Sequence, residues 1–189
     1  MIAPGGDGRG RRPDGAGPAA SFEIVEVQTA AGGVIGLARL PGLRDGRFRW
    51  DLLEDELDRV AEWGATAILC LIENDEIPDL DPERMLFETR RRDIGFLHLP
   101  IPEGTVPGAA FDTAWEGLRG RLIRAVGKCQ RPLVLCSDGR GRCSMIAARL
   151  LIDSGMQVEA AIRALRDASP GALRDREHEE NVRAYARGR

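Results

Sequence analysis

Continuous apolar stretches alternate along this chain with stretches in which apolar residues recur every three or four positions. The first pattern indicates buried β-strands and the second indicates amphipathic helices. Strands followed in turn by helices predict an α/β domain with a mainly parallel central sheet and helices on both faces. The strands are expected at 22–27, 34–40, 65–72, 94–99 and 132–136, and the helices at 51–63, 111–126, 143–153, 158–168 and 174–186.

Two of these segments carry more detailed expectations. Residues 22–27 alternate apolar and acidic side chains, as an edge strand does, whereas 65–72 is continuously apolar, as in a strand covered on both faces. Asp51 and Glu54 have the spacing of a capping box and are therefore expected to cap the first helix.

The composition is that of an ordinary soluble domain. The 189 residues are 43% hydrophobic and 30% charged, and no apolar run is long enough to span a membrane. The net charge of −3 disfavours a nucleic-acid binder. Residues 1–20 are rich in Gly, Pro and Arg and lack the apolar core of a signal peptide, so we predict a flexible tail followed by one domain, 21–189.

Four cysteines and two histidines do not form a zinc-binding pattern, so no metal or other cofactor is predicted. A disulfide framework is not expected in a chain of this size without a secretion signal, and a reducing, cytoplasmic location follows as an expectation. The cysteines are Cys70, Cys129, Cys136 and Cys143.

The chemistry is expected in the loop Cys136-Ser-Asp-Gly-Arg-Gly-Arg142, which joins a strand to a helix. Gly139 and Gly141 permit a backbone that turns successive N–H groups inward, and the helix N-terminus adds further free N–H groups. A phosphate would fit this nest, with Arg142 as a bidentate clamp. The positive surroundings would lower the pKa of Cys136, whose thiolate would then attack phosphorus. The phosphate-binding positions are Ser137, Asp138, Gly139, Arg140, Gly141 and Arg142.

This loop resembles the signature of the protein tyrosine and dual-specificity phosphatases, and the chain is most similar to the kinase-associated phosphatase group and its bacterial relatives. The resemblance covers roughly residues 33–187 and implies the fold predicted above. It also implies a general acid on the loop that follows the preceding strand, where Glu103 stands in the position of an Asp. Asp112 is the nearest competing acid, although capping of a helix is its expected role. The matching segments are 34–37, 40–42, 63–69, 71–76, 99–107 and 169–173.

Several positions depart from the family pattern. Leu135 replaces a His before the nucleophile, and Cys143 replaces a Ser or Thr whose hydroxyl stabilises the leaving thiolate, with Ser144 one place later. A thiol is the weaker donor, so breakdown of a phosphocysteine intermediate would be slow. His178 matches a Gln that positions the hydrolytic water, but its side chain is expected to face solvent.

The remaining polar residues near these segments receive simpler interpretations. Asp138 is expected to point out of the loop, balanced by Arg140. Glu73, Asp75 and Glu76 are interpreted as solvent-facing carboxylates in preference to a metal cluster, and 90–92 as a solvated basic turn.

Three functions remain open at this point. The first is a phosphatase acting on phosphotyrosine, on phosphoserine and phosphothreonine as well, or on another phosphate ester. The second is a catalytically weak phosphate-binding module, and the third is a rhodanese-type sulfurtransferase, which the resemblance outside the loop disfavours. A phosphorylated substrate is the expected partner, and the oligomeric state is left open.

Overall fold

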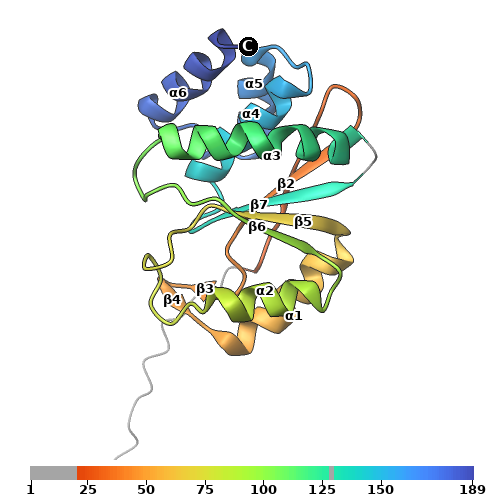
Figure 1. Ribbon diagram of the computed structural model, residues 1–189, viewed down its shortest axis with the longest axis vertical. Helices are drawn as coiled ribbons and strands as arrows, with labels where there is room; N and C mark the ends of the chain where they lie inside the picture. Colours follow the sequence, from red (N-terminus) through yellow and green to blue (C-terminus); the bar gives the residue numbers. More distant parts are fainter. Residues whose placement is uncertain (1–20, 128–129) are drawn as a thin grey trace, which may run out of the picture.

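Five strands form a central sheet in the order β1-β2-β7-β5-β6 in the computed structural model, which describes residues 21–127 and 130–189 (Figure 1). The four strands from β2 to β6 in this order run parallel, and β1 pairs antiparallel with β2 at the edge. The predicted mainly parallel sheet is therefore confirmed, while the predicted tail, 1–20, lies outside the described residues. The strands are β1 (Val25–Gln28), β2 (Val34–Arg39), β5 (Ala65–Cys70), β6 (Gly95–His98) and β7 (Arg131–Cys136).

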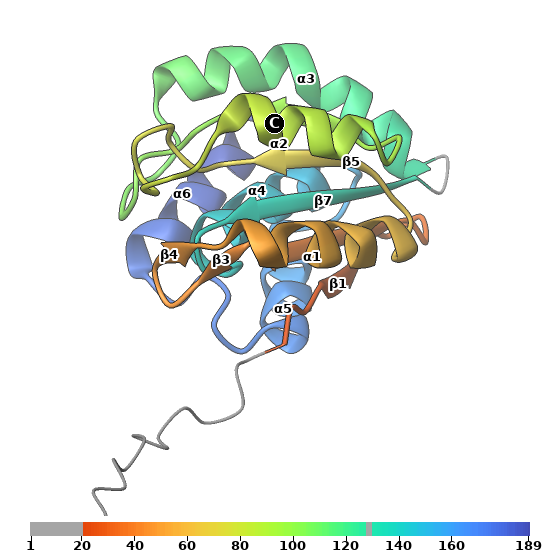
Figure 2. The same ribbon diagram turned by 90° about the horizontal axis from the view of Figure 1, so that it is seen from below.

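Helices cover both faces of this sheet, as Figures 1 and 2 show. On one face lie α1 (Trp50–Glu62) and α2 (Pro82–Arg90), and on the other lie α3 (Ala109–Gly127), α4 (Gly141–Asp153), α5 (Val158–Ala168) and α6 (Arg176–Arg187). Each layer has its own hydrophobic core. Leu53, Leu57 and Val60 of α1 pack in one core, as their spacing predicts, and Trp115 of α3 is fully buried in the other.

Three local features differ from the predictions. A short hairpin of β3 (Leu43–Arg44) and β4 (Arg47–Phe48) and the helix α2 were not predicted. The capping box is wrong because α1 begins one residue before Asp51, and the Asp51 carboxylate pairs with Arg49 instead of capping the helix.

The parallel strands bring the loops that follow them to one edge of the sheet. Leu40, after β2, donates its N–H to the carbonyl of Cys136 at 2.9 Å, and Leu71, after β5, donates to that of Leu135 at 2.9 Å. Ile101, after β6, donates to the Leu71 carbonyl at 3.0 Å. The segments that carry the predicted nucleophile and the predicted acid are therefore neighbours. Among the described residues, no helix is long and apolar enough to cross a bilayer.

Candidate active site

The loop from Cys136 to Arg142 leaves the end of β7 and enters the first turn of α4. Gly139 lies at its turn with φ +71°, a conformation that favours glycine. A Cβ atom there would also come within 2.6 Å of the Arg39 nitrogen and 2.7 Å of the Ala38 carbonyl carbon. Glycine is therefore required at this position both for its backbone conformation and for close contact between the loop and β2.

The Cys136 side chain is fully buried between two groups. Its Sγ lies 2.9 Å from the Cys143 Sγ and 3.2 Å from Asp138 Oδ1. Burial, followed by the hydrogen bond to Cys136, raises the pKa of Cys143 well above its ordinary value, so Cys143 stays a neutral thiol that can donate a hydrogen bond. Cys143 thus occupies the place where the resemblance implies a hydroxyl, directly beside the predicted nucleophile.

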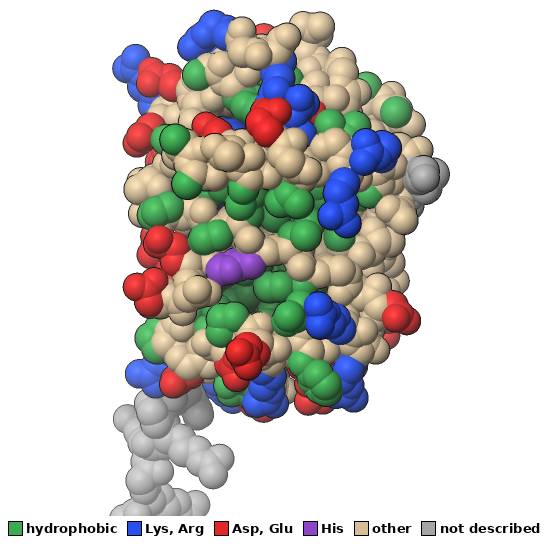
Figure 3. All heavy atoms as spheres, viewed as in Figure 1, with side chains coloured by type: hydrophobic (Ala, Val, Ile, Leu, Met, Phe, Trp, Pro, Cys, Tyr) green, Lys and Arg blue, Asp and Glu red, His purple; other side chains and the backbone are tan. Residues whose placement is uncertain are grey.

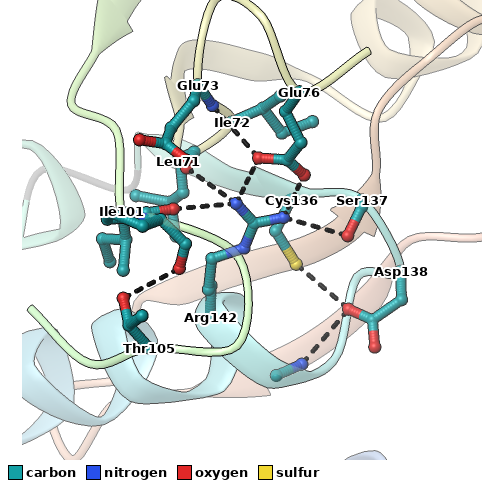
Figure 4. A network of polar contacts seen from close by, with 12 residues as sticks. Leu71, Ile72, Glu73, Glu76, Ile101, Thr105, Cys136, Ser137, Asp138 and Arg142 are labelled. Atoms are coloured by element: carbon teal, nitrogen blue, oxygen red, sulfur yellow. Dashed lines mark hydrogen bonds and ion pairs between the residues drawn. The ribbon is translucent and has the colours of Figure 1, made fainter.

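Arg142 is held in place by Glu76, which lies in the loop after β5 (Figure 4). The two guanidinium Nη atoms donate to the two Glu76 carboxylate oxygens at 2.6 and 2.5 Å, and Nη1 also donates to the Ile101 carbonyl at 2.8 Å. Nη2 donates to Ser137 Oγ at 2.9 Å. Burial lowers the pKa of Arg142, but the hydrogen bond and charge of Glu76 outweigh it and raise that pKa. The guanidinium is therefore a fixed cation beside the Cys136 sulfur.

Asp138 is exposed, but one of its carboxylate oxygens turns toward the loop, so the expectation that it points outward is only partly correct (Figure 4). Its Oδ1 accepts the backbone N–H of Arg140 at 2.9 Å and that of Gly141 at 3.2 Å, in addition to its contact with Cys136. Burial raises the pKa of Asp138, but these three hydrogen bonds more than offset it and leave the pKa below its ordinary value. The loop's N–H donors make this inward orientation favourable because they favour the ionised carboxylate.

Two of the auxiliary residues also differ from expectation. His178 is 7% exposed rather than solvent-facing, and a Cβ added to Gly141 would lie 3.3 Å from its ring. It therefore packs against the base of the loop. The Ser144 hydroxyl donates to the Arg140 carbonyl and has no described contact with Cys136. Ser144 thus stabilises the loop backbone, while Cys143 is the donor beside the sulfur.

Glu103 lies in an exposed turn after β6, between Pro102 and Gly104. Its charge contributes to the raised pKa of Arg142, which places it within electrostatic range of that cation. Asp112 lies in the first turn of α3, and its carboxylate pairs with Arg149 at 2.5 Å. Asp112 therefore links α3 to α4 through this ion pair. Of the two acids, Glu103 is the one that is not held in a described ion pair.

Several other residues with sequence-based expectations have structural roles. Arg92, predicted to be solvated, is 13% exposed in its side chain and pairs with Asp58 and Glu88 at 2.6 and 3.0 Å. Leu135 is fully buried in the core beneath α1.

Acidic, His and Cys side chains do not gather into a metal-binding group anywhere in 21–127 or 130–189. Charges of both signs are dispersed over the helical layers on the face seen in Figure 3.

Glu76 is a further residue of this site that sequence reasoning misplaced. Its side chain is 7% exposed and binds Arg142, so it is neither a solvent-facing carboxylate nor part of a metal cluster. No local pattern could identify this partner, because the contact joins residues 66 positions apart.

Comparison with known proteins supports a phosphatase relationship, although no protein-family model matches the chain. A human protein, "protein tyrosine phosphatase type IVA 3", is 26% identical over 124 residues, which are 64% of this chain and 65% of that protein. This chain thus spans slightly less than two thirds of the curated relative it matches.

Solved structures extend the likeness over most of the domain. Kinase-associated phosphatase, with its catalytic cysteine substituted by serine, has a TM-score of 0.76 at 20% identity and covers 89% of this chain and 96% of its own. The active form of Tk-PTP has a TM-score of 0.64 at 25% identity and covers 83% and 94%. The expected resemblance to the tyrosine and dual-specificity phosphatases is therefore confirmed, and the fold is theirs.

Proposed function

From its resemblance in fold and sequence to the protein tyrosine and dual-specificity phosphatases, we propose that this chain hydrolyses phosphate monoesters through a phosphocysteine intermediate. Phosphotyrosine is the proposed substrate, with phosphoserine and phosphothreonine as further candidates. The observation that carries this proposal is the position of Cys136 at the start of a loop that leads into a helix, with its sulfur near the fixed cation of Arg142.

The mechanism assigns one role to each element of the site. The Cys136 thiolate attacks phosphorus, the P–O bond to the leaving group breaks, and Glu103 donates a proton to the departing oxygen. Loop N–H groups and Arg142 stabilise the charge on the transferring oxygens. Water then gives a proton to the Glu103 carboxylate and attacks phosphorus. The P–S bond breaks and releases phosphate and the Cys136 thiolate, to which the neutral Cys143 thiol donates a hydrogen bond.

A panel of phosphopeptides and an aryl phosphate, assayed for released phosphate, tests this proposal. Wild type should release phosphate, whereas Cys136→Ser should not, because a serine hydroxyl stays protonated in a site that stabilises a thiolate. Arg142→Ala should lose both phosphate binding and turnover. Cys70→Ser is the matched control, since it replaces another buried thiol that is outside the loop. Phosphate release by a clean Cys136→Ser preparation at the wild-type rate would exclude the mechanism.

A catalytically weak phosphate-binding module is the second candidate. Two observations favour it: the Asp138 carboxylate occupies loop donors, and a thiol replaces the usual hydroxyl at Cys143. This candidate predicts that wild type and Cys136→Ser both bind phosphopeptides and that neither releases phosphate.

A further inference from the structure

The Asp138 carboxylate makes the contacts that a substrate phosphate would need. Its Oδ1 accepts the N–H groups of Arg140 and Gly141, the last residues of the loop before Arg142, at 2.9 and 3.2 Å. The same oxygen lies 3.2 Å from the Cys136 sulfur. An anionic oxygen is thus already bound at the place where the nucleophile meets the anion-binding N–H groups.

A phosphate poised for attack cannot share this position. Reacting atoms approach to about 3–3.5 Å before the bond forms, so phosphorus and its oxygens must lie directly over the sulfur. The carboxylate oxygen lies at that distance, and its charge would oppose a dianion in a partly desolvated site. Binding of phosphate therefore requires Asp138 to leave.

We propose that Asp138 is an internal competitor for the substrate phosphate, which lowers the affinity of the loop for any phosphate group until its carboxylate swings out. This inference rests on the proposed function for its biological meaning, but the competition itself concerns phosphate binding alone.

The structure also provides a place for the displaced carboxylate. A cavity of about 370 Å³ lies beside the loop, and Asp138 and Ser137 form part of its wall. Arg39 and Arg44 line the same cavity from β2 and the β3–β4 hairpin. Both guanidinium groups pair with Glu56. A carboxylate that turned toward this cavity would therefore lie near two positively charged side chains.

The competition should appear as a reduced apparent affinity. When the binding-competent state is only a fraction of the population, the apparent Kd rises by the inverse of that fraction. Asp138→Ala removes the competitor, so we expect the Kd for inorganic phosphate to fall about tenfold. Asp138→Asn keeps the shape and one acceptor oxygen but loses the charge, so its Kd should lie between those of wild type and Asp138→Ala.

The test is calorimetric titration of inorganic phosphate into the full chain, as wild type, Asp138→Ala and Asp138→Asn. Asp45→Ala is the matched control, because Asp45 lines the same cavity but accepts no described hydrogen bond from the loop. Its Kd should change less than that of Asp138→Ala. An equal fall in the two Kd values would overturn the proposal, because general electrostatics would then explain both.

Asp138→Asn keeps the proposal falsifiable if Asp138→Ala does not fold. A Kd for either folded variant equal to or above that of wild type would also overturn it. The result is separable from phosphatase activity. Tighter phosphate binding without turnover would contradict the proposed function only, whereas normal turnover with an unchanged Kd would contradict this inference only.

Discussion

Glu76 holds Arg142 in a bidentate ion pair, with both carboxylate oxygens within 2.6 Å of the guanidinium nitrogens and both side chains almost fully buried. The pair joins the loop after β5 to the first turn of α4. It therefore links the stability of the fold to the orientation of the cation that the proposed mechanism requires.

Removal of Glu76 should lower both the stability of the fold and the rate of phosphate release. Glu76→Ala leaves the Arg142 charge buried without its partner, which typically costs about 3–5 kcal/mol. Urea denaturation should show this loss, and phosphate release should fall with it. Asp75→Ala is the control, since Asp75 is an exposed neighbour in the same loop. Equal stability of the two variants would show that the ion pair is not important for the fold.

Gly139 should tolerate no side chain. Gly139→Ala places a Cβ within 2.6 Å of the β2 backbone at a positive φ. Strain of about 1–2 kcal/mol from φ adds to a further cost of about 1–3 kcal/mol from overpacking. Gly104→Ala separates the backbone strain from the overpacking, because Gly104 has φ +69° but a Cβ atom added there would have no other atom within 4 Å. Urea denaturation should show a larger loss for Gly139→Ala, and equal losses would contradict the steric argument.

Cys143→Ser should raise the steady-state rate. A hydroxyl is a better donor than the thiol that now lies 2.9 Å from the Cys136 sulfur, so the thiolate would leave phosphorus more readily. Pre-steady-state kinetics should show a burst of the leaving group in wild type and a smaller burst in the variant. An unchanged or lower rate would mean that breakdown of the intermediate does not limit turnover.

Glu103→Gln should affect substrates according to their leaving groups. As general acid, Glu103 is needed most for a poor leaving group, so turnover of a phosphopeptide should fall about 10²-fold or more. The loss should be smaller for an aryl phosphate whose phenol is already acidic. Asp112→Asn is the control, since the Asp112 carboxylate pairs with Arg149. Equal losses of Glu103→Gln on both substrates would argue against proton donation.

The central strands and helices could be predicted from sequence because their apolar spacing is strong and local. The apolar run at 65–72 and the Cys136–Arg142 loop between a strand and a helix are where the pattern places them. Helix α2 was missed because its sequence, PERMLFETR, is mostly polar, although Asp81 before Pro82 is a start signal and does cap the helix. The β3–β4 hairpin has only two residues in each strand.

The site was only partly predictable because long-range contacts determine it. The segments of Cys136, Arg142 and Glu103 are brought to one edge by the parallel sheet, as the pattern implies. By contrast, the inward turn of Asp138 depends on which N–H groups the folded loop leaves free, and the burial of His178 depends on how α6 packs against Gly141. Neither depends on local sequence.

The central claim is that Cys136 carries the phosphoryl group, and trapping that intermediate tests it most directly. A rapid acid quench of wild type with a labelled phosphate ester, followed by peptide mapping, should find label on the peptide that contains Cys136 and on no other. Cys136→Ser should retain no label, whereas the Cys70→Ser control should be labelled like wild type. Phosphate release by wild type with no label trapped at Cys136, or with label on another residue, would contradict the account.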